Sequence, residues 1–260
     1  MSVIALAIQK GGSGKTTTAI NLAAALQRAG KKVLLVDADP QANLTQALGI
    51  AEEPELHLYT ALKKEIAGEE AELSQAIVTT PCGLMLVPSA LELAGAELEL
   101  VGMYGREQVL SWMLKPLQAQ FDFILIDCPP AIGMLTVNAL VASQYIIMPL
   151  QAEFLPLKGV RSFMYHFGNI KKKLNTNLEV LGIVLTKYDD RKSMNRQVRK
   201  ELETTFGTTV LDTAIRSNIQ LAKAQQAGMD IFSFDNTSHG AKDYHALGEE
   251  ILGKLPAMGS

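Results

Sequence analysis

Residues 1–17 read MSVIALAIQKGGSGKTT, and this stretch decides the fold class. An apolar run at 3–8 is followed directly by a glycine-rich segment and then by helix-forming residues. Strand, glycine loop and helix in that order are the context in which a phosphate-binding loop occurs. Glycines let successive backbone N–H groups turn toward phosphate oxygens, and the helix that follows adds its positive N-terminal end. The sequence therefore predicts a phosphate site at the end of the first strand.

The rest of the chain alternates between apolar runs and helical patterns, which predicts an α/β fold. Ala19, Leu22, Ala23 and Leu26 repeat at the spacing of one buried helix face. Runs that are apolar throughout are typical of parallel strands buried on both faces; they occur at 33–36, 84–87, 123–126, 145–150 and 180–185. We expect a three-layer α/β/α P-loop NTPase fold with a mostly parallel central sheet, formed by residues 1–260 as a single domain. Residues 51–80 and 89–120 are predicted to be helical excursions beside the sheet.

Composition excludes several classes of protein. The 260 residues are 48% hydrophobic and 20% charged, which rules out intrinsic disorder. Cys82 and Cys128 are too few for a disulfide scaffold and form no Cys-x-x-Cys pair, so a cytoplasmic protein without a zinc site is expected. No apolar run approaches the ~20 residues that a membrane span needs. The net charge of −3 argues against a uniformly basic nucleic-acid binder.

Three aspartates follow predicted strands. Asp37 and Asp39 lie in VLLVDADPQ at 33–41, and Asp127 lies in FILIDCPP at 123–130. A lone aspartate at a strand end is often a helix cap or a solvated turn residue. Ligands of open α/β sheets, however, bind along the carboxyl edge of the strands, so three carboxylates beside a phosphate loop favour a role in the site.

The loop departs from the general pattern Gly-x-x-x-x-Gly-Lys-[Ser/Thr]. Position 9 is glutamine, and Lys10 precedes a glycine pair instead. The resulting KGGSGKTT resembles the deviant Walker A motif of the ParA/MinD family of dimerising P-loop ATPases. Segment 33–41 looks like that family's second conserved element, and 123–130 resembles its Walker B motif. The resemblance extends through 151–154 and 238–244, and is closest to small chromosomal and plasmid partition ATPases of the ParA or Soj type. Because the loop begins at residue 10, no N-terminal helix-turn-helix domain is expected.

The loop chemistry and the resemblance together imply ATP and Mg²⁺ as cofactors. Lys15 is expected at the β and γ phosphates, and the Thr16 hydroxyl as a direct magnesium ligand. Asp39 is the candidate that positions the attacking water, and it joins Asp37 and Asp127 in holding the magnesium shell through waters. The resemblance implies that Lys10 reaches the ATP of a second subunit, so that two chains sandwich the nucleotide. The predicted phosphate contacts are Lys10, Gly11, Gly12, Ser13, Gly14, Lys15, Thr16 and Thr17.

Contacts beyond the phosphates are predicted at two places. By resemblance, Glu153 lies near the nucleotide. Lys158 stands where family members often carry an acidic residue; it is either a solvated surface lysine or a second cationic contact across the dimer. The base is expected between Thr186, Lys187, Ile215 and Arg216, and relatives usually have proline where this chain has Arg216.

A concentrated basic segment modifies the inference from net charge. Residues 187–200 carry six lysines and arginines against two aspartates, a net charge of +4. Ser193 is the predicted N-cap of a helix that places Arg196, Arg199 and Lys200 on one face. Such a face is either simply solvated or binds DNA phosphates without reading bases. The resemblance favours non-specific DNA binding by an ATP-state dimer on the nucleoid. The predicted DNA contacts are Arg191, Lys192, Arg196, Arg199, Lys200, Arg216 and Lys223.

The resemblance also suggests partners and rivals. A ParA-type ATPase partitions a chromosome or plasmid with a ParB-like partner, whereas an orphan relative positions a protein cargo, such as a carboxysome or a chemoreceptor array, through a small adaptor. A MinD-like membrane ATPase needs a basic amphipathic C-terminal helix, but residues 246–256 read ALGEEILGKLP, which is acidic and ends in proline. No membrane partner is therefore expected. A nitrogenase-reductase-like protein would need cluster-binding cysteines that Cys82 and Cys128 do not provide.

Overall fold

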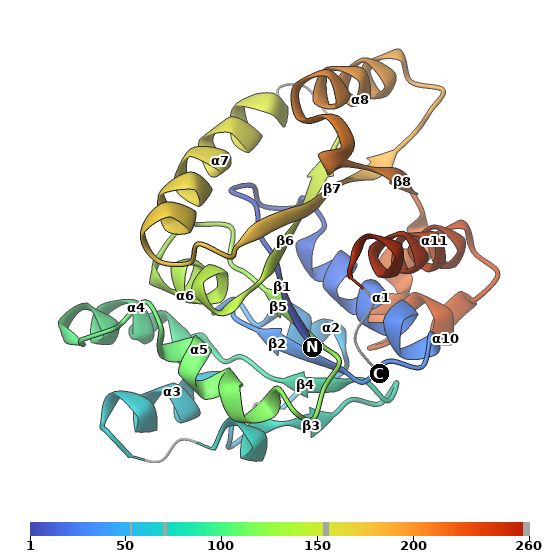
Figure 1. Cartoon of the computed structure of the whole chain (residues 1–260). Coiled ribbons are helices and arrows are strands. Elements are labelled where there is room, and N and C mark those ends of the chain that lie inside the picture. The colour runs from blue at the N-terminus through green and yellow to red at the C-terminus, as the bar shows by residue number, and fades with distance from the viewer. Residues whose placement is uncertain (53, 70–71, 153–155, 257–260) are drawn as a thin grey trace.

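A computed structural model describes residues 1–52, 54–69, 72–152 and 156–256. Its centre is an eight-stranded sheet in the order β3-β4-β2-β5-β1-β6-β7-β8, and every neighbouring pair is parallel except β3 and β4 (Figure 1). The strands are β1 (Ser2–Leu6), β2 (Val33–Asp37), β3 (Val78–Thr79), β4 (Met85–Val87), β5 (Phe123–Asp127), β6 (Tyr145–Gln151), β7 (Glu179–Tyr188) and β8 (Val210–Arg216). The predicted α/β class and mostly parallel sheet are confirmed.

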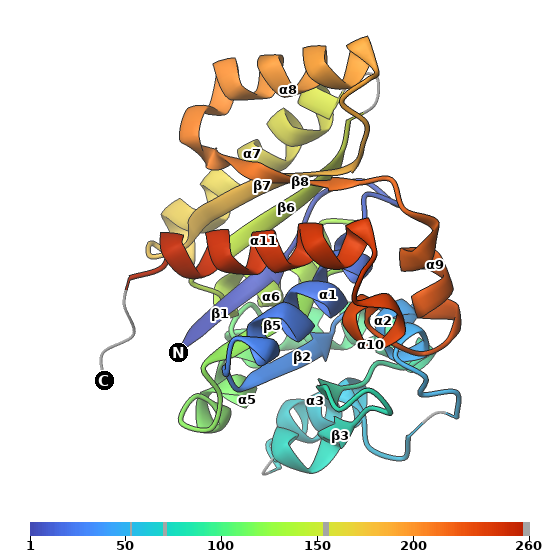
Figure 2. The same ribbon diagram turned by 90° about the vertical axis from the view of Figure 1, so that its right-hand side faces the viewer.

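Helices cover both faces of the sheet, which gives the three layers seen in Figures 1 and 2. One buried cluster lies under α1 (Lys15–Arg28), α2 (Asn43–Ala47), α9 (Ile219–Gln226), α10 (Ile231–Asp235) and α11 (His239–Lys254). The other lies under α3 (Leu58–Ile66), α4 (Ala96–Glu99), α5 (Val109–Leu114), α6 (Met134–Ala142), α7 (Pro156–Lys173) and α8 (Ser193–Phe206). Short 3-10 turns occupy Leu73–Ala76, Leu91–Gly95, Leu100–Gly102, Lys115–Leu117 and Gly207–Thr209.

Helix α1 is buried more completely than its sequence pattern suggests. The predicted face, made by Ala19, Leu22, Ala23 and Leu26, is fully buried, as expected. Residues 18–26 are nevertheless all buried, because α11 packs alongside α1 on the same face of the sheet (Figure 2). The helix that follows the phosphate loop is therefore held by the sheet and by α11 together.

The predicted strands agree with β1, β2, β4, β5, β6 and β7 to within a few residues, and two strands were missed. Strand β8 lies at an edge of the sheet and pairs with β7 alone among the described strands. Its seven residues, VLDTAIR, are partly buried and partly exposed, and polar residues interrupt them, so it has no continuous apolar run. Strand β3 contains two residues, too few for any pattern. Residues 51–80 and 89–120 contain helices, as predicted, but short ones broken by turns.

The strand order places the site. Strand β5 lies between β1 and β2, and Asp127 at its end is in register with both Leu6 and Asp37. The loop after β1 and the ends of β2 and β5 therefore meet at one edge of the sheet. Residues that are far apart in the chain, at 10–17, 37–39 and 127, become neighbours for this reason.

Candidate nucleotide site

The glycine loop curls in the way that its composition predicts. Gly12 and Gly14 have φ of 69° and 94°, in the left-handed region where glycine is unstrained. Helix α1 begins at Lys15, directly after the loop. The loop carbonyls are held from outside: Thr186 donates a 2.8 Å hydrogen bond to the carbonyl of Ser13, and the Gln151 amide donates to the carbonyl of Gly12. These contacts fix the backbone that would cradle phosphates.

Lys15 is buried in the loop, with 7% of its surface exposed. Its Nζ lies 3.3 Å from the carbonyl oxygen of Lys10, so the side chain folds back over the loop that precedes it. In this position the ammonium group would contact the phosphates of a nucleotide bound within the loop.

Thr16 and Asp127 are joined directly. The Thr16 hydroxyl donates a 2.7 Å hydrogen bond to Oδ2 of Asp127, while the buried Oδ1 of Asp127 accepts no hydrogen bond from the described residues. Burial, reinforced by the nearby Asp37, raises the pKa of Asp127 to about 8. A buried carboxylate oxygen without a donor beside a threonine hydroxyl is a donor set that suits a magnesium ion and its waters.

Asp37, the last residue of β2, and Asp39, two residues later, differ in their surroundings. Asp37 is fully buried and accepts hydrogen bonds from the Thr45 backbone at 2.9 Å, from the Thr45 hydroxyl at 2.7 Å and from the Asp39 backbone at 3.2 Å. Burial raises the pKa of Asp37 to about 7. Asp39 instead lines the open cleft, where its Oδ1 accepts from the Gln41 backbone at 3.0 Å. Asp37 therefore holds the turn that presents Asp39, and its part in a magnesium shell stays a prediction.

A cleft of about 940 Å³ opens beside the loop, a size suited to a nucleotide. The cleft is lined by all four residues that were predicted to contact the base. Two of them, however, bind other residues of the protein. The Thr186 hydroxyl is bonded to the loop, and Arg216 forms an ion pair with Asp243 of α11, with 2.6 Å between its guanidinium and the carboxylate. Ile215 is buried, and Lys187 is exposed at the rim.

Sequence reasoning missed one wall of this cleft. Asn43, Gln46, Asn218, Gln225 and Gln226 contribute amide side chains to it. The Gln225 amide donates to the Thr17 hydroxyl at 3.2 Å, which links α9 to the start of α1. No local pattern marks these residues, because α2 and α9 reach the cleft through the packing of separate elements.

Comparison with known proteins supports the geometry. A family model described as an AAA domain matches residues 1–180. The chromosome-partitioning ATPase Soj of Treponema pallidum is 41% identical over 247 residues, which are 95% of each chain. The sporulation initiation inhibitor protein Soj of Bacillus subtilis is 40% identical over 96% of this chain and 97% of that protein. The chain belongs to the ParA/Soj-type P-loop ATPases.

A solved structure with the same fold contains a nucleotide and magnesium. The crystal structure of a cobyrinic acid a,c-diamide synthase from Mycobacterium smegmatis, with bound ADP and magnesium, is 34% identical, and the match covers all of both chains with a TM-score of 0.83. ATP and Mg²⁺ are accordingly the cofactors of this ParA/Soj-type ATPase. Among the described residues, no three His, Cys, Asp or Glu side chains gather in a group that could hold a metal by themselves. Mg²⁺ is usually held by one or two protein oxygens together with phosphates and waters. Thr16 and Asp127 would be such donors, and their role as magnesium ligands stays a prediction.

Two predicted contacts of the ATPase have no described side chain. Glu153 lies outside the described residues. Lys158 falls within α7, but its side chain also lies outside what the structure describes. The two interpretations of Lys158 stay open.

The helix in the basic segment of this ParA/Soj-type ATPase begins one residue earlier than predicted. Helix α8 starts at Ser193, and its N-cap is Lys192, so the prediction of Ser193 as N-cap was wrong. The backbone of Lys192 instead donates to the carbonyl of Asp189 in the preceding turn. The residue that caps a helix depends on where that turn ends, which the sequence does not mark.

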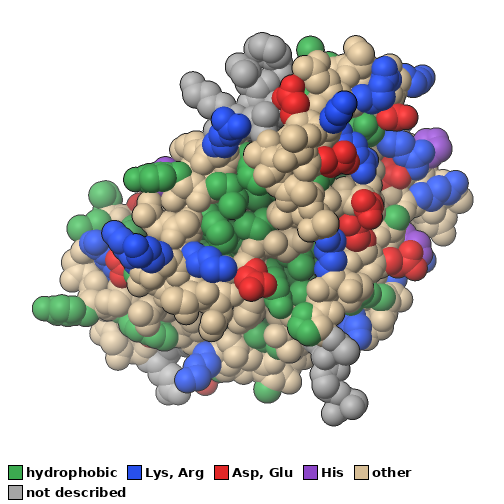
Figure 3. Space-filling view, turned by 45° about the horizontal axis from the view of Figure 1, so that its top comes forward, with side chains coloured by type: hydrophobic (Ala, Val, Ile, Leu, Met, Phe, Trp, Pro, Cys, Tyr) green, Lys and Arg blue, Asp and Glu red, His purple; other side chains and the backbone are tan. Residues whose placement is uncertain are grey.

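Several charges of this segment have partners within the fold. Arg191 pairs with Asp189 at 3.0 Å, Arg199 pairs with Glu203 at 2.8 Å, and Arg196 donates to a backbone carbonyl. Lys192 and Lys200 are exposed, as is Lys223 on α9. In the view of Figure 3 basic and acidic side chains are interspersed, so the local positive charge is smaller than the basic residues alone suggest.

Every helix in the described part of the chain is too short or too polar to cross a membrane.

Proposed function

We propose that this ATPase is a nucleotide-dependent dimeric switch. In its ATP state it binds DNA without sequence preference and partitions a chromosome or plasmid with a ParB-like partner. The name of the Treponema relative supports the process. The observation that supports the dimer is the extra lysine at position 10: Lys15 and the glycines line the cleft of their own chain, whereas Lys10, the residue before the glycine pair, is not among the lining residues. A lysine in that place suits the nucleotide of a second subunit.

The chain's own residues divide the work of hydrolysis. The loop N–H groups and Lys15 bind the phosphates and neutralise their charge. Asp39, at the wall of the cleft, orients the attacking water, and Asp37 holds the turn that carries it. Thr16 and Asp127 would hold a magnesium ion, which supplies further charge neutralisation at the β and γ phosphates. Lys10 of the second subunit adds positive charge to the transition state.

DNA binding in this scheme depends on the dimer. One chain of net charge −3, with several of its arginines paired, presents a weak basic surface. Two chains joined at the nucleotide would bring together two sets of exposed lysines, including Lys192, Lys200 and Lys223. The residues 1–260 would act as one ATPase domain in this switch, and the ATP-bound dimer would lie on the nucleoid.

A salt series tests the proposal. We expect random-sequence DNA to bind with ATP but not with ADP, and its log Kd to rise with log salt at a slope of about 0.9 per phosphate contact. Lys200→Ala should reduce that slope and weaken binding, whereas Lys32→Ala, an exposed lysine at the opposite end of β2, should not. Binding that ignores nucleotide or salt would reject the DNA switch, and ATP-dependent binding to anionic vesicles instead would favour a membrane ATPase.

A further inference from the structure

A carboxylate outside the phosphate site holds the loop that follows Asp127. Glu97, in the single turn of α4, accepts hydrogen bonds from the backbone N–H groups of Met134 and Leu135, at 2.7 Å and 3.1 Å. These are the first two residues of α6. The residue at the N-cap position, Gly133, has no side chain to offer, so a residue 37 positions earlier in the chain performs the capping.

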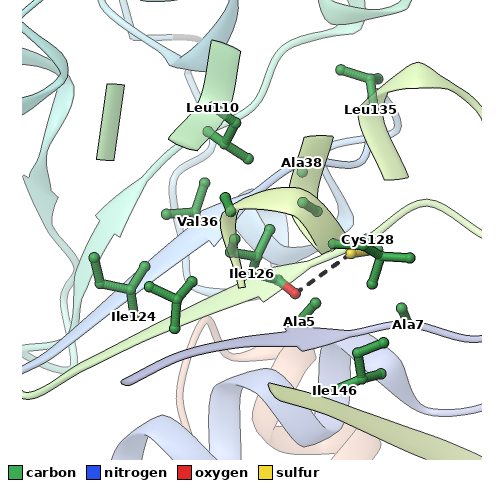
Figure 4. Close-up of a cluster of buried hydrophobic side chains, with 14 of the residues drawn as sticks. Ala5, Ala7, Val36, Ala38, Leu110, Ile124, Ile126, Cys128, Leu135 and Ile146 are labelled. Atoms are coloured by element: carbon green, nitrogen blue, oxygen red, sulfur yellow. Dashed lines mark hydrogen bonds between the residues drawn. The ribbon is translucent and has the colours of Figure 1, made fainter. Parts of the chain in front are cut away.

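The capped helix begins four residues after the Walker B segment 123–130. Residues 128–133 run from the neighbour of Asp127 to the first turn of α6, and Pro130 within them lines the nucleotide cleft. The core holds this loop on both sides, because Cys128 at its start and Leu135 in the first turn of α6 belong to one buried cluster (Figure 4). The Thr136 hydroxyl also donates to the carbonyl of Ala131 at 2.6 Å. The first turn of α6 therefore sets where the loop lies at the cleft.

The fit of Glu97 requires glycine at position 133. A Cβ on Gly133 would overlap the carboxylate of Glu97. The backbone angle there, φ −102°, is open to any residue, so the requirement is for space and not for conformation. A methyl group at 133 would push the carboxylate off the helix end.

The body of α6 does not depend on this contact. Asn138 accepts from the Leu110 backbone at 3.1 Å and donates to the Arg106 carbonyl at 2.7 Å. Loss of Glu97 should therefore release the first turn of α6 and the loop before it, and leave the helix in place.

We infer that Glu97 is a positioning residue for ATP hydrolysis, which acts by holding loop 128–133 at the nucleotide cleft through the N-terminus of α6. The inference rests on the proposed assignment of Asp127 and the cleft to hydrolysis. The segment that carries Glu97 also exposes large apolar side chains: Leu98 is 80% exposed and Tyr104 is 98% exposed. A displacement of this segment would be transmitted to the loop through Glu97.

Amide hydrogen exchange tests the contact without nucleotide. In Glu97→Ala, exchange at Met134 and Leu135 should rise about fivefold, the effect of losing one helix cap, while exchange later in α6 stays unchanged. Glu97→Gln should lie between Glu97→Ala and the parent chain, because its amide oxygen can accept one of the two hydrogen bonds. Glu99→Ala, two residues along and bonded to the Tyr59 hydroxyl, is the matched control and should leave both amides unchanged.

Kinetics test the consequence. In Glu97→Ala, kcat should fall about tenfold, because loop 128–133 no longer lies in its place at the nucleotide cleft. The Kd for ATP should change less than about twofold, because the phosphate loop is intact. Gly133→Ala should reproduce both effects, and the double variant should be no worse than either single one. Unchanged kcat with faster exchange would overturn the positioning role, and unchanged exchange would overturn the contact itself. If DNA binding or dimerisation is absent in the parent chain, the proposed switch fails, but the exchange and ATP-turnover results still decide the role of Glu97.

Discussion

The hydroxyl of Thr16 donates a 2.7 Å hydrogen bond to the carboxylate of Asp127, which joins the start of α1 to the end of β5. Thr16 follows the phosphate loop by its place in the chain, whereas Asp127 reaches it because β5 pairs with β1. The two groups that would share a magnesium ion are thus positioned by different parts of the fold. Each can be changed separately.

Removing the loop cation should abolish nucleotide binding. Lys15→Ala takes the buried ammonium from the loop that would face the β and γ phosphates. We expect ATP affinity to fall by about a hundredfold or more, since charge-assisted phosphate contacts are among the strongest in proteins. Equilibrium binding of a fluorescent ATP analogue measures this, with Lys32→Ala as the control. Affinity within twofold of the parent chain would show that Lys15 does not contact phosphate.

Asp39→Ala should separate binding from hydrolysis. The carboxylate lies at the cleft wall and holds the Gln41 backbone, and it makes no contact with the glycine loop among the described residues. ATP should still bind, while kcat falls about a hundredfold or more because the attacking water loses its orientation. The proposed dimer should also persist in this variant, because its ATP is not hydrolysed. Single-turnover hydrolysis measures the loss of turnover, and light scattering with ATP measures the dimer. Normal turnover would mean that another residue positions the water.

The stability of the nucleotide-free protein should depend on the protonation of Asp127. Its pKa rises from 3.8 to about 8 on folding, so the folded chain binds more protons than the unfolded chain between these values. The contribution of this group to the free energy of unfolding should therefore be largest below pH 3.8. The free energy of unfolding should then decline as the pH rises toward about 8, with a slope of up to about 1.4 kcal/mol per pH unit.

Urea unfolding in EDTA at several pH values measures that slope, and Asp127→Asn should reduce it. The asparagine keeps an acceptor for Thr16 and cannot ionise, so this variant should gain on the parent chain as the pH rises. An identical pH dependence in both proteins would contradict a raised pKa at Asp127.

Thr45 should be a stability residue for the site. Its hydroxyl donates to Asp37 at 2.7 Å and accepts from the Ser89 backbone at 3.0 Å, all within the core. Thr45→Val leaves both partners without that contact and should lower the free energy of unfolding by about 1–3 kcal/mol. Thr45→Ser, which keeps the hydroxyl, should cost clearly less. Equal losses in the two variants would attribute the effect to packing of the methyl group.

Features that depend on contiguous residues could be predicted from the sequence. The glycine loop, α1 and the buried strands β1, β2 and β5 are each encoded in a short run, and with them the placement of Lys15, Asp39 and Asp127 at one sheet edge. The reason is physical: backbone curvature, periodicity and the parallel strand order of such folds are local or generic properties.

Contacts between distant elements are visible only in the folded chain. Glu97 caps a helix 37 residues away, Arg216 is held by Asp243 of α11, and the edge strand β8 lacks an apolar run. The structure also shows that Arg191 and Arg199 of the basic segment are paired with acidic neighbours. A side chain's partner depends on which surfaces pack together, and no spacing along the chain records that. The phosphate site could therefore be predicted from its residues, whereas the groups that hold it in position could not.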